Sequence, residues 1–340
     1  MKKKLIIIAE GGVNHNGKLE IAKKIINEAQ KSGANYVKFQ CYKTENLIVE
    51  NTKLANYQMK NLNKNINDQY KLLKNLELSQ KNIKLIVKHA KLRRIKIIFS
   101  IFDIDSYYFI KKLKLDYIKI PSGEINNINL LKVIAKDNSK IIISTGMSDI
   151  DEIKNAIKVL TRHGTKRENL TVLHCNTDYP TPIQDINMRA MITIKEKLNV
   201  NVGYSDHSID RFVPVIATAI GANIIEKHFT IDQKLIGPDH KASLNPKSFK
   251  EMVSDIRNTE KILGSDKKDI TKSESKNLKI VRKSIVANCD INKGQKFTRK
   301  NIAIKRPGGG LPPSIYDSLI GKIAKQNYKT NEKIRWLKYV

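Results

Sequence analysis

The sequence predicts a (β/α)₈ TIM barrel followed by a small, mostly β domain. Two observations point to the barrel: eight short runs of branched apolar residues recur in about the first 230 residues, and stretches with helical periodicity separate them. Parallel strands buried on both faces have this continuous apolar pattern. A doubly wound open sheet shows the same alternation. The count of eight, and the lack of a glycine-rich dinucleotide fingerprint after the first run, favour the closed barrel.

Each apolar run ends on residues with polar or charged side chains. The runs and their ends are Leu5 to Ala9 with Glu10; Tyr36-Val37 with Lys38 and Gln40; Ile97 to Phe99 with Ser100; Tyr117 to Ile120 with Ser122 and Glu124; Ile141 to Ile143 with Ser144; Thr171 to Leu173 with His174; Val202 to Tyr204 with Ser205, Asp206 and His207; and Ile224-Ile225 with Glu226 and His228. The carboxyl ends of all barrel strands meet at one face, where active sites are built. These residues therefore predict one shared pocket.

Helical periodicity between the runs is clearest over 19–31, 79–92, 150–162 and 213–222. After the eighth run, Pro246 to Leu263 has the pattern of a further helix, with Asn245 as its cap. We predict a barrel domain over 1–264, a polar linker over 265–281, and a small domain over 282–340 with strands at 284–287, 297–304 and 333–339. The long connection 43–78 is either a lid or specificity element, or a disordered polar insertion.

Composition limits the possible partners. The 340 residues include 63 Lys and Arg against 33 Asp and Glu, a formal charge of +30. Such a surplus can indicate nucleic acid or an anionic membrane. Here it consists mostly of lysines scattered over predicted helix faces, without a recognition motif or an aromatic stacking series. We interpret it as a solvated surface and predict neither a nucleic-acid nor a membrane partner.

Three widely spaced cysteines, Cys41, Cys175 and Cys289, fit neither a disulfide framework nor a zinc motif. No apolar stretch reaches membrane-spanning length, and the start of the chain lacks a signal-peptide pattern. We expect a cytoplasmic protein.

Two histidines at neighbouring strand ends suggest a metal. His207 and His228 follow the seventh and eighth runs, so their imidazoles would share one rim. Neutral imidazole is a common ligand of Mn, Co or Zn, with oxygen ligands or water filling the other positions. The flanking acids Asp206 and Glu226 favour the metal interpretation, and Glu10 and Asp239 could supply further acidic groups or orient the ligands. Two packed, hydrogen-bonded structural histidines are the alternative.

Two lysines in the strands suggest an anion. Lys38 and Lys119 cannot be buried without a partner except at a large free-energy cost. Hydroxyls at neighbouring strand ends would complete a phosphate or carboxylate site; these belong to Ser122, Ser144 and Ser205. Internal ion pairs with Glu10, Glu124 or Glu226 are the alternative. A metal ion next to an anion pocket could polarise the carbonyl of one substrate while the pocket binds a second, phosphorylated substrate.

Eight ordered motifs resemble those of the bacterial sialic acid synthases. They are the segments 9–17, 37–40, 119–124, 144–147, 174–182, 203–207, 226–230 and 237–240. The tail is similar to the antifreeze-like (SAF) domain of that family through Ser284 to Ala287 and Lys305 to Gly308. The likeness covers essentially the whole chain. It implies condensation of phosphoenolpyruvate with the open-chain aldehyde of an N-acylated hexosamine, giving a nine-carbon 2-keto sugar acid and phosphate.

The resemblance also implies a role for each site residue. The catalytic residues would be Glu10 and Glu124, which handle protons and place water, together with His207 and His228, which hold Mn²⁺, Mg²⁺ or Co²⁺. Phosphoenolpyruvate would be bound by Lys38, Lys119, Ser122, Ser144 and Ser205. The sugar would be contacted by Gln40, Tyr179, Asp239 and Arg306. Arg306 would reach the barrel of a partner subunit, because dimers of the family exchange the small domain.

Two positions depart from the family pattern. Gly11 replaces the usual apolar residue, and Ser100-Ile101-Phe102-Asp103 is one residue shorter than the usual segment and lacks its Thr, which would remove one phosphate contact. Our leading hypothesis is N-acetylneuraminate synthase acting on N-acetylmannosamine. Legionaminate synthase, acting on 2,4-diacetamido-2,4,6-trideoxymannose, is the first alternative, and pseudaminate synthase is a more distant one. A non-catalytic basic protein that binds anions or nucleic acid is the alternative of another class.

Overall fold

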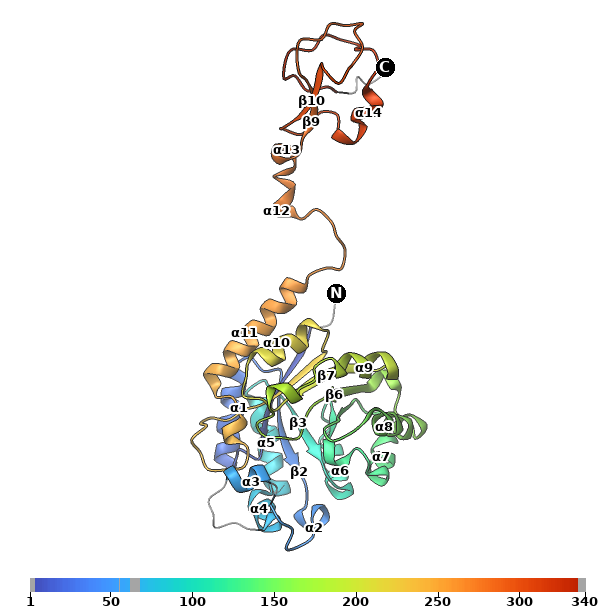
Figure 1. Cartoon of the computed structure of the whole chain (residues 1–340). Coiled ribbons are helices and arrows are strands. Elements are labelled where there is room, and N and C mark those ends of the chain that lie inside the picture. The colour runs from blue at the N-terminus through green and yellow to red at the C-terminus, as the bar shows by residue number, and fades with distance from the viewer. Residues whose placement is uncertain (1–3, 55, 62–67, 336–340) are drawn as a thin grey trace. The chain divides into compact units, whose positions relative to one another are not determined.

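The barrel prediction is confirmed. The computed structural model describes residues 4–54, 56–61 and 68–335. The chain divides into two compact units, Met1–Gly264 and Ser265–Val340. In the first, eight parallel strands pair in sequence order and β8 closes onto β1, with helices around them (Figure 1). The strands are β1 Ile6–Gly12, β2 Tyr36–Cys41, β3 Lys96–Ile101, β4 Ile118–Ile120, β5 Ile141–Ser144, β6 Leu170–His174, β7 Asn201–Asp206 and β8 Ile224–His228.

The helices that cover the barrel include those expected from helical periodicity over 19–31, 79–92, 150–162, 213–222 and 246–263. They are α1 Leu19–Lys31, α5 Gln80–Leu92, α6 Ile104–Lys111, α7 Ile128–Ala135, α8 Ile150–Arg162, α9 Ala190–Leu198, α10 Phe212–Ala219 and α11 Pro246–Leu263. The reason is clear in α1, where Ala22, Ile25, Ile26 and Ala29 are buried at helical spacing. The pattern at 213–222 overran α10, which ends at Ala219.

Two apolar layers result from the strand alternation. One large core fills the space between strands and helices. A second, small cluster combines residues from six strands with Tyr117, just before β4; it consists of Ile8, Tyr36, Ile98, Tyr117, Ile142, Leu173 and Ile224. Successive strand side chains point to opposite faces, so Glu10 shares the face of Ile8, and Lys38 that of Tyr36. The small cluster therefore lies within the barrel, and a polar layer sits directly above it.

The connection 43–78 is partly helical rather than a plain loop. It contains α2 Thr44–Leu47, α3 Asn56–Asn61 and α4 Gln69–Leu76, while residues 55 and 62–67 lie outside the described part. Asn61 Nδ2 donates to Pro238 O at 2.8 Å, which joins this connection to the loop after β8. Its role as a specificity element stays a prediction.

The second unit has its own small core, which includes Ile285, Phe297 and Ile334. Its elements are α12 Lys272–Ser275, α13 Leu278–Val281, β9 Ser284–Ala287, β10 Ile302–Lys305 and α14 Tyr316–Leu319. The expected linker 265–281 thus contains two short helices. The predicted strand over 297–304 was too long, because Thr298 and Asn301 form a turn before β10. Of the strand expected at 333–339, Lys333 pairs with Val286 in an isolated bridge, and residues 336–339 lie outside the described part.

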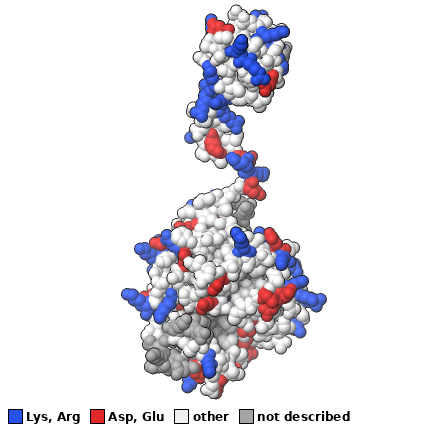
Figure 2. Space-filling view, in the orientation of Figure 1, with Lys and Arg blue, Asp and Glu red and all other residues white. Residues whose placement is uncertain are grey.

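Figure 2 shows Lys and Arg dispersed among Asp and Glu on the visible face of the barrel unit, as expected for a solvated surface. Among the described residues, no helix combines the length and apolar character needed to cross a membrane.

Candidate active site

The polar layer within the barrel is built around Lys38. Its Nζ lies 2.7 Å from Glu10 Oε2 and 3.7 Å from Glu226 Oε2, and it donates to Ser100 Oγ at 2.8 Å. All four side chains are buried. Lys38 and Ser100 come from β2 and β3, whereas Glu10 and Glu226 come from β1 and β8, so the ammonium group joins four adjacent strands.

Lys119 makes a matching set of contacts from β4. Its Nζ donates to Ser144 Oγ at 2.6 Å and to Glu226 Oε1 at 3.2 Å. Ser205 Oγ donates to the same Glu226 oxygen at 2.8 Å. Glu226 is therefore shared by both lysines and one predicted serine. The predicted lysines therefore lie close to Ser144 and Ser205. They also form the internal ion pairs that were the alternative, with Glu10 and Glu226 as the partners.

Charge in this cluster is unevenly distributed. Burial, together with repulsion from Glu226, raises the pKa of Glu10 to about 7 in spite of the neighbouring Lys38. Burial alone would also raise the pKa of Glu226, but attraction by Lys119 and Lys38 outweighs it and lowers that pKa. When Glu10 holds a proton, the cluster carries two ammonium charges against one carboxylate. An incoming anion then meets a net positive site in a region of low dielectric constant.

Other predicted residues lie at the edge of this cluster. Ser122 begins the short turn Ser122–Glu124, and its Oγ accepts from Gly146 N at 3.0 Å. Glu124 is half-buried and accepts from Asn127 Nδ2 at 2.7 Å; burial raises its pKa. Gln40 is half-buried on β2, and its Cα is paired with that of Ser100.

The two predicted metal ligands are brought together. The rings of His207 and His228 have centroids 5.2 Å apart. Tyr179 stacks on His207 at 4.2 Å and meets His228 edge-on at 5.4 Å. Asp239 Oδ2 lies 3.9 Å from His228 Nδ1, and burial raises the Asp239 pKa to about 6.

The state of these imidazoles fits a divalent cation. Burial lowers the pKa of His207 to about 4 and that of His228 well below its usual value, so both are neutral near neutral pH. His207 Nδ1 donates to the carbonyl of Asn176, which can only accept, so its Nε2 carries the lone pair. His228 Nδ1 is buried, and no described residue gives it a hydrogen-bond partner. No group of three or more potential ligands occurs in the part of the chain that the structure describes.

Arg306 belongs to the second unit, where it is exposed and directly follows β10. The barrel residues belong to the first unit, and each unit is described by itself. Its contact with a sugar in a partner subunit stays a prediction.

The two positions that depart from the family pattern, Gly11 and the segment 100–103, each make specific contacts in the barrel. A Cβ on Gly11 would lie 2.7 Å from Phe39 Cε1, so the glycine makes room for that ring. In the shortened segment, Ser100 contacts Lys38, and Asp103 caps α6 while accepting from Lys43 N at 3.0 Å.

Sequence reasoning underrated two residues. Both were expected at strand ends of the shared pocket, but neither was given a role in the anion site: Glu226 was a flanking acid or an ion-pair partner, and Ser100 belonged to the shortened segment. Strand alternation could have identified both, since Glu226 is two residues before His228, and Ser100 two after Ile98.

Comparison with known proteins decides the family. The NeuB family model matches residues 25–268, and the SAF domain model matches residues 282–340. The chain belongs to the NeuB family. It is accordingly an enzyme that condenses phosphoenolpyruvate with a sugar to form a sugar acid, in the group that includes the sialic, legionaminic and pseudaminic acid synthases. The alternative of a non-catalytic binding protein is set aside.

Relatives of this NeuB protein match it over most or nearly all of its length. The N,N'-diacetyllegionaminic acid synthase of Campylobacter jejuni is 47% identical, over 98% of this chain and 99% of its own. The enzyme of the same name from Legionella pneumophila is 38% identical, over 97% and 93%. The crystal structure of an N-acetylneuraminic acid synthetase from Leptospira borgpetersenii has a TM-score of 0.70 and 31% identity, over 81% of this chain and 90% of its own.

Proposed function

We propose that this enzyme is an N,N'-diacetyllegionaminate synthase that condenses phosphoenolpyruvate with 2,4-diacetamido-2,4,6-trideoxymannose. The observation that carries the proposal is its higher identity to two legionaminic acid synthases than to the sialic acid synthetase of known structure. N-Acetylneuraminate synthesis from N-acetylmannosamine, our leading hypothesis from the sequence, becomes the competing assignment.

In the proposed mechanism the buried lysines hold phosphoenolpyruvate. Lys38 and Lys119 exchange part of their contact with Glu226 for the phosphate and carboxylate of the substrate, and Ser144 and Ser205 add hydroxyl donors. Ser122 contributes from the neighbouring turn. Each of these groups is already held by its neighbours, which limits the reorganisation that binding requires.

His207 and His228 would hold Mn²⁺, Mg²⁺ or Co²⁺, and that ion would polarise the sugar aldehyde. The C3 carbon of phosphoenolpyruvate forms the new bond to the aldehyde carbon, water adds at C2, and phosphate leaves. Glu10, whose raised pKa allows it to carry a proton, is placed to transfer one beside Lys38. Glu124 would place the water, while Gln40, Tyr179 and Asp239 would contact the sugar.

Sugar choice is tested by phosphate release from phosphoenolpyruvate with each sugar in turn. We expect kcat/KM to be at least about tenfold higher with the diacetamido sugar than with N-acetylmannosamine, a difference of about 1.4 kcal/mol. The reverse order would assign the enzyme as an N-acetylneuraminate synthase. Phosphate release in the absence of any sugar would contradict the condensation mechanism.

The metal site is tested separately, by Mn²⁺ binding. His207→Ala and His228→Ala should each lose tight Mn²⁺ binding in a calorimetric titration, and a chelator should abolish wild-type activity until Mn²⁺ is restored. His163→Ala is the matched control, because His163 is an exposed residue at the end of α8. Unchanged Mn²⁺ affinity in both site variants would show that the ligands lie elsewhere.

A further inference from the structure

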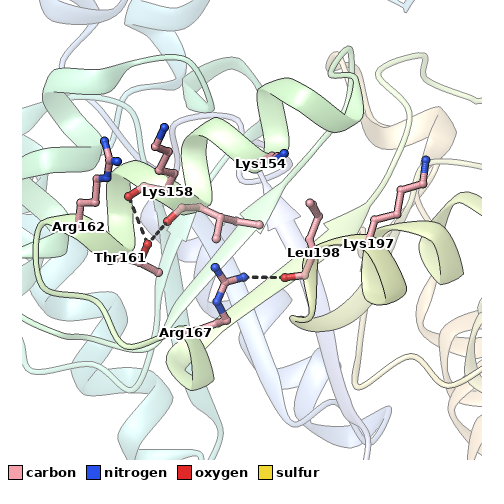
Figure 3. A pocket seen from close by; sticks show the side chains of 8 residues that line it. Lys154, Lys158, Thr161, Arg162, Arg167, Lys197 and Leu198 are labelled. Atoms are coloured by element: carbon pink, nitrogen blue, oxygen red, sulfur yellow. Dashed lines mark hydrogen bonds between the residues drawn. The ribbon is translucent and has the colours of Figure 1, made fainter.

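A cavity lies outside the barrel, between α8, the turn Arg167–Asn169 before β6 and the end of α9. It has a volume of about 310 Å³, within the range of small-molecule sites. Its floor is apolar, formed by the buried side chains of Ile157 and Leu198. Five exposed cationic side chains line it, as Figure 3 shows; they are Lys154, Lys158, Arg162, Arg167 and Lys197.

None of these five cations forms an ion pair with another residue of the described chain, and no acidic side chain lines the cavity. Some surface lysines elsewhere do have such partners, for example Lys43 with Asp105 and Lys96 with Asp116, whereas Lys84 and Lys88 on α5 resemble the cavity lysines in forming no ion pair with a described residue. Arg167 is held by one bond, from its Nη1 to Leu198 O at 2.6 Å, which leaves its other N–H groups available.

Helix electrostatics explain only part of this arrangement. Arg162 and Lys197 lie in the last turns of α8 and α9, where cations complement the helix dipole. Lys154 and Lys158 lie before the last turn of α8 and extend the same charge along one helix face. Mutual repulsion among five cations around one hollow is relieved by a ligand that carries several negative charges.

We propose that this cavity binds a nucleotide through its phosphates. Arg and Lys side chains donate charge-assisted hydrogen bonds to phosphate oxygens. The aliphatic stems of these side chains, above the nearly buried Ile157 and Leu198, would give the flat base apolar contacts. Thr161 does not compete for the phosphates, because its hydroxyl bonds the carbonyls of Ile157 and Lys158.

The cavity is distinct from the active site. Leu198 precedes β7, whereas Ser205 and His207 lie at the other end of that strand. Arg167 likewise precedes β6. The nucleotide therefore occupies the amino-terminal side of the barrel, away from the rim where barrel enzymes carry out catalysis.

Calorimetric titration with ATP tests the proposal. The double variant Lys154→Glu, Lys158→Glu should raise the Kd for ATP at least about tenfold, because it reverses two charges at the cavity. The control is Lys84→Glu, Lys88→Glu on α5, which makes the same charge change at the same helical spacing and should alter the Kd less than about twofold. Equal effects would show that only net charge matters and would overturn the site.

Two competitions complete the test on the wild-type protein. Phosphoenolpyruvate should leave ATP bound, whereas displacement would place ATP at Lys38 and Lys119 and overturn the proposal. Tripolyphosphate should bind more weakly than ATP, because it cannot use the apolar floor; equal affinity would exclude a nucleotide-specific site. A single-stranded oligonucleotide that binds more tightly than ATP and is lost in the α8 variant would also overturn the proposal, in favour of nucleic acid.

Discussion

The two sides of strand β8 carry buried ion pairs of different kinds. Glu226 faces the inside of the barrel, where it is shared by Lys38 and Lys119. The next residue, Lys227, faces the surrounding helices and pairs with Asp206 Oδ2 at 2.5 Å. Lys227 is fully buried, and it also donates to the carbonyls of Ser208 and Asp210.

The difference teaches that burial alone does not distinguish a functional charge from a structural one. Lys227 has carboxylate and backbone carbonyl partners for all three of its donors, and these partners cannot be exchanged for a ligand. The inner lysines instead contact serine hydroxyls and shared carboxylates, which an incoming anion can replace. The face of the strand on which its side chain lies, inside or outside the barrel, decides the role of each lysine.

The largest expected effect comes from breaking the outer pair. Lys227→Met leaves the Asp206 carboxylate buried without its cation and should lower the free energy of unfolding by about 3–5 kcal/mol. Urea unfolding measures this, with Lys88→Met on an exposed helix face as the control. Adding Asp206→Leu should recover part of the loss. A large rise in the KM for phosphoenolpyruvate would instead place Lys227 in the active site.

Breaking the inner set should reduce activity more than stability. Lys119→Met removes one ammonium group from the anion site and should lower kcat/KM for phosphoenolpyruvate by about 10²- to 10³-fold. Glu226 keeps Lys38 and Ser205, so unfolding should change less than in Lys227→Met. Steady-state kinetics and urea unfolding on the same preparation decide this. Near-wild-type kinetics would make the inner pair structural as well.

A buried neutral group provides a test through pH. Burial lowers the pKa of His15 to about 4, while in the unfolded chain it stays near 6.5. As pH falls from about 6.5 to about 4, the unfolded state takes up a proton that the folded state does not. Protonation of His15 in the unfolded state should therefore lower the free energy of unfolding by about 3 kcal/mol across this window, and by nothing further below it. Urea unfolding at several pH values should show that the free energy of unfolding falls less steeply with decreasing pH in His15→Gln than in the wild type. An unchanged slope would mean that other groups cause the loss of stability.

The smallest expected effect concerns the exposed Arg306, which lies outside both buried sets. Arg306→Ala should raise the KM for the sugar about tenfold and leave that for phosphoenolpyruvate within about twofold, if it contacts the N-acyl group in a partner subunit. Lys305→Ala on the adjacent position is the control. If the variant has the same KM as the wild type for each substrate, Arg306 does not contact the sugar.

The barrel could be predicted because its signal is local. Runs such as Ile141 to Ile143 are buried on both faces, and the helices between the strands repeat every three to four residues. The small domain was harder, because its core is small and its elements are held by turns; the turn at Thr298–Asn301 replaced the first half of a predicted strand.

The sequence by itself determined the fold and the set of side chains at the strand ends, since strand alternation assigns each of these to a face. Only the tertiary structure decided how they pair. Lys38 meets Ser100, 62 positions away, and Lys119 meets Glu226, 107 positions away. Such contacts depend on the register of neighbouring strands and on side-chain direction, and a single residue of slip would turn every one of them to the other face.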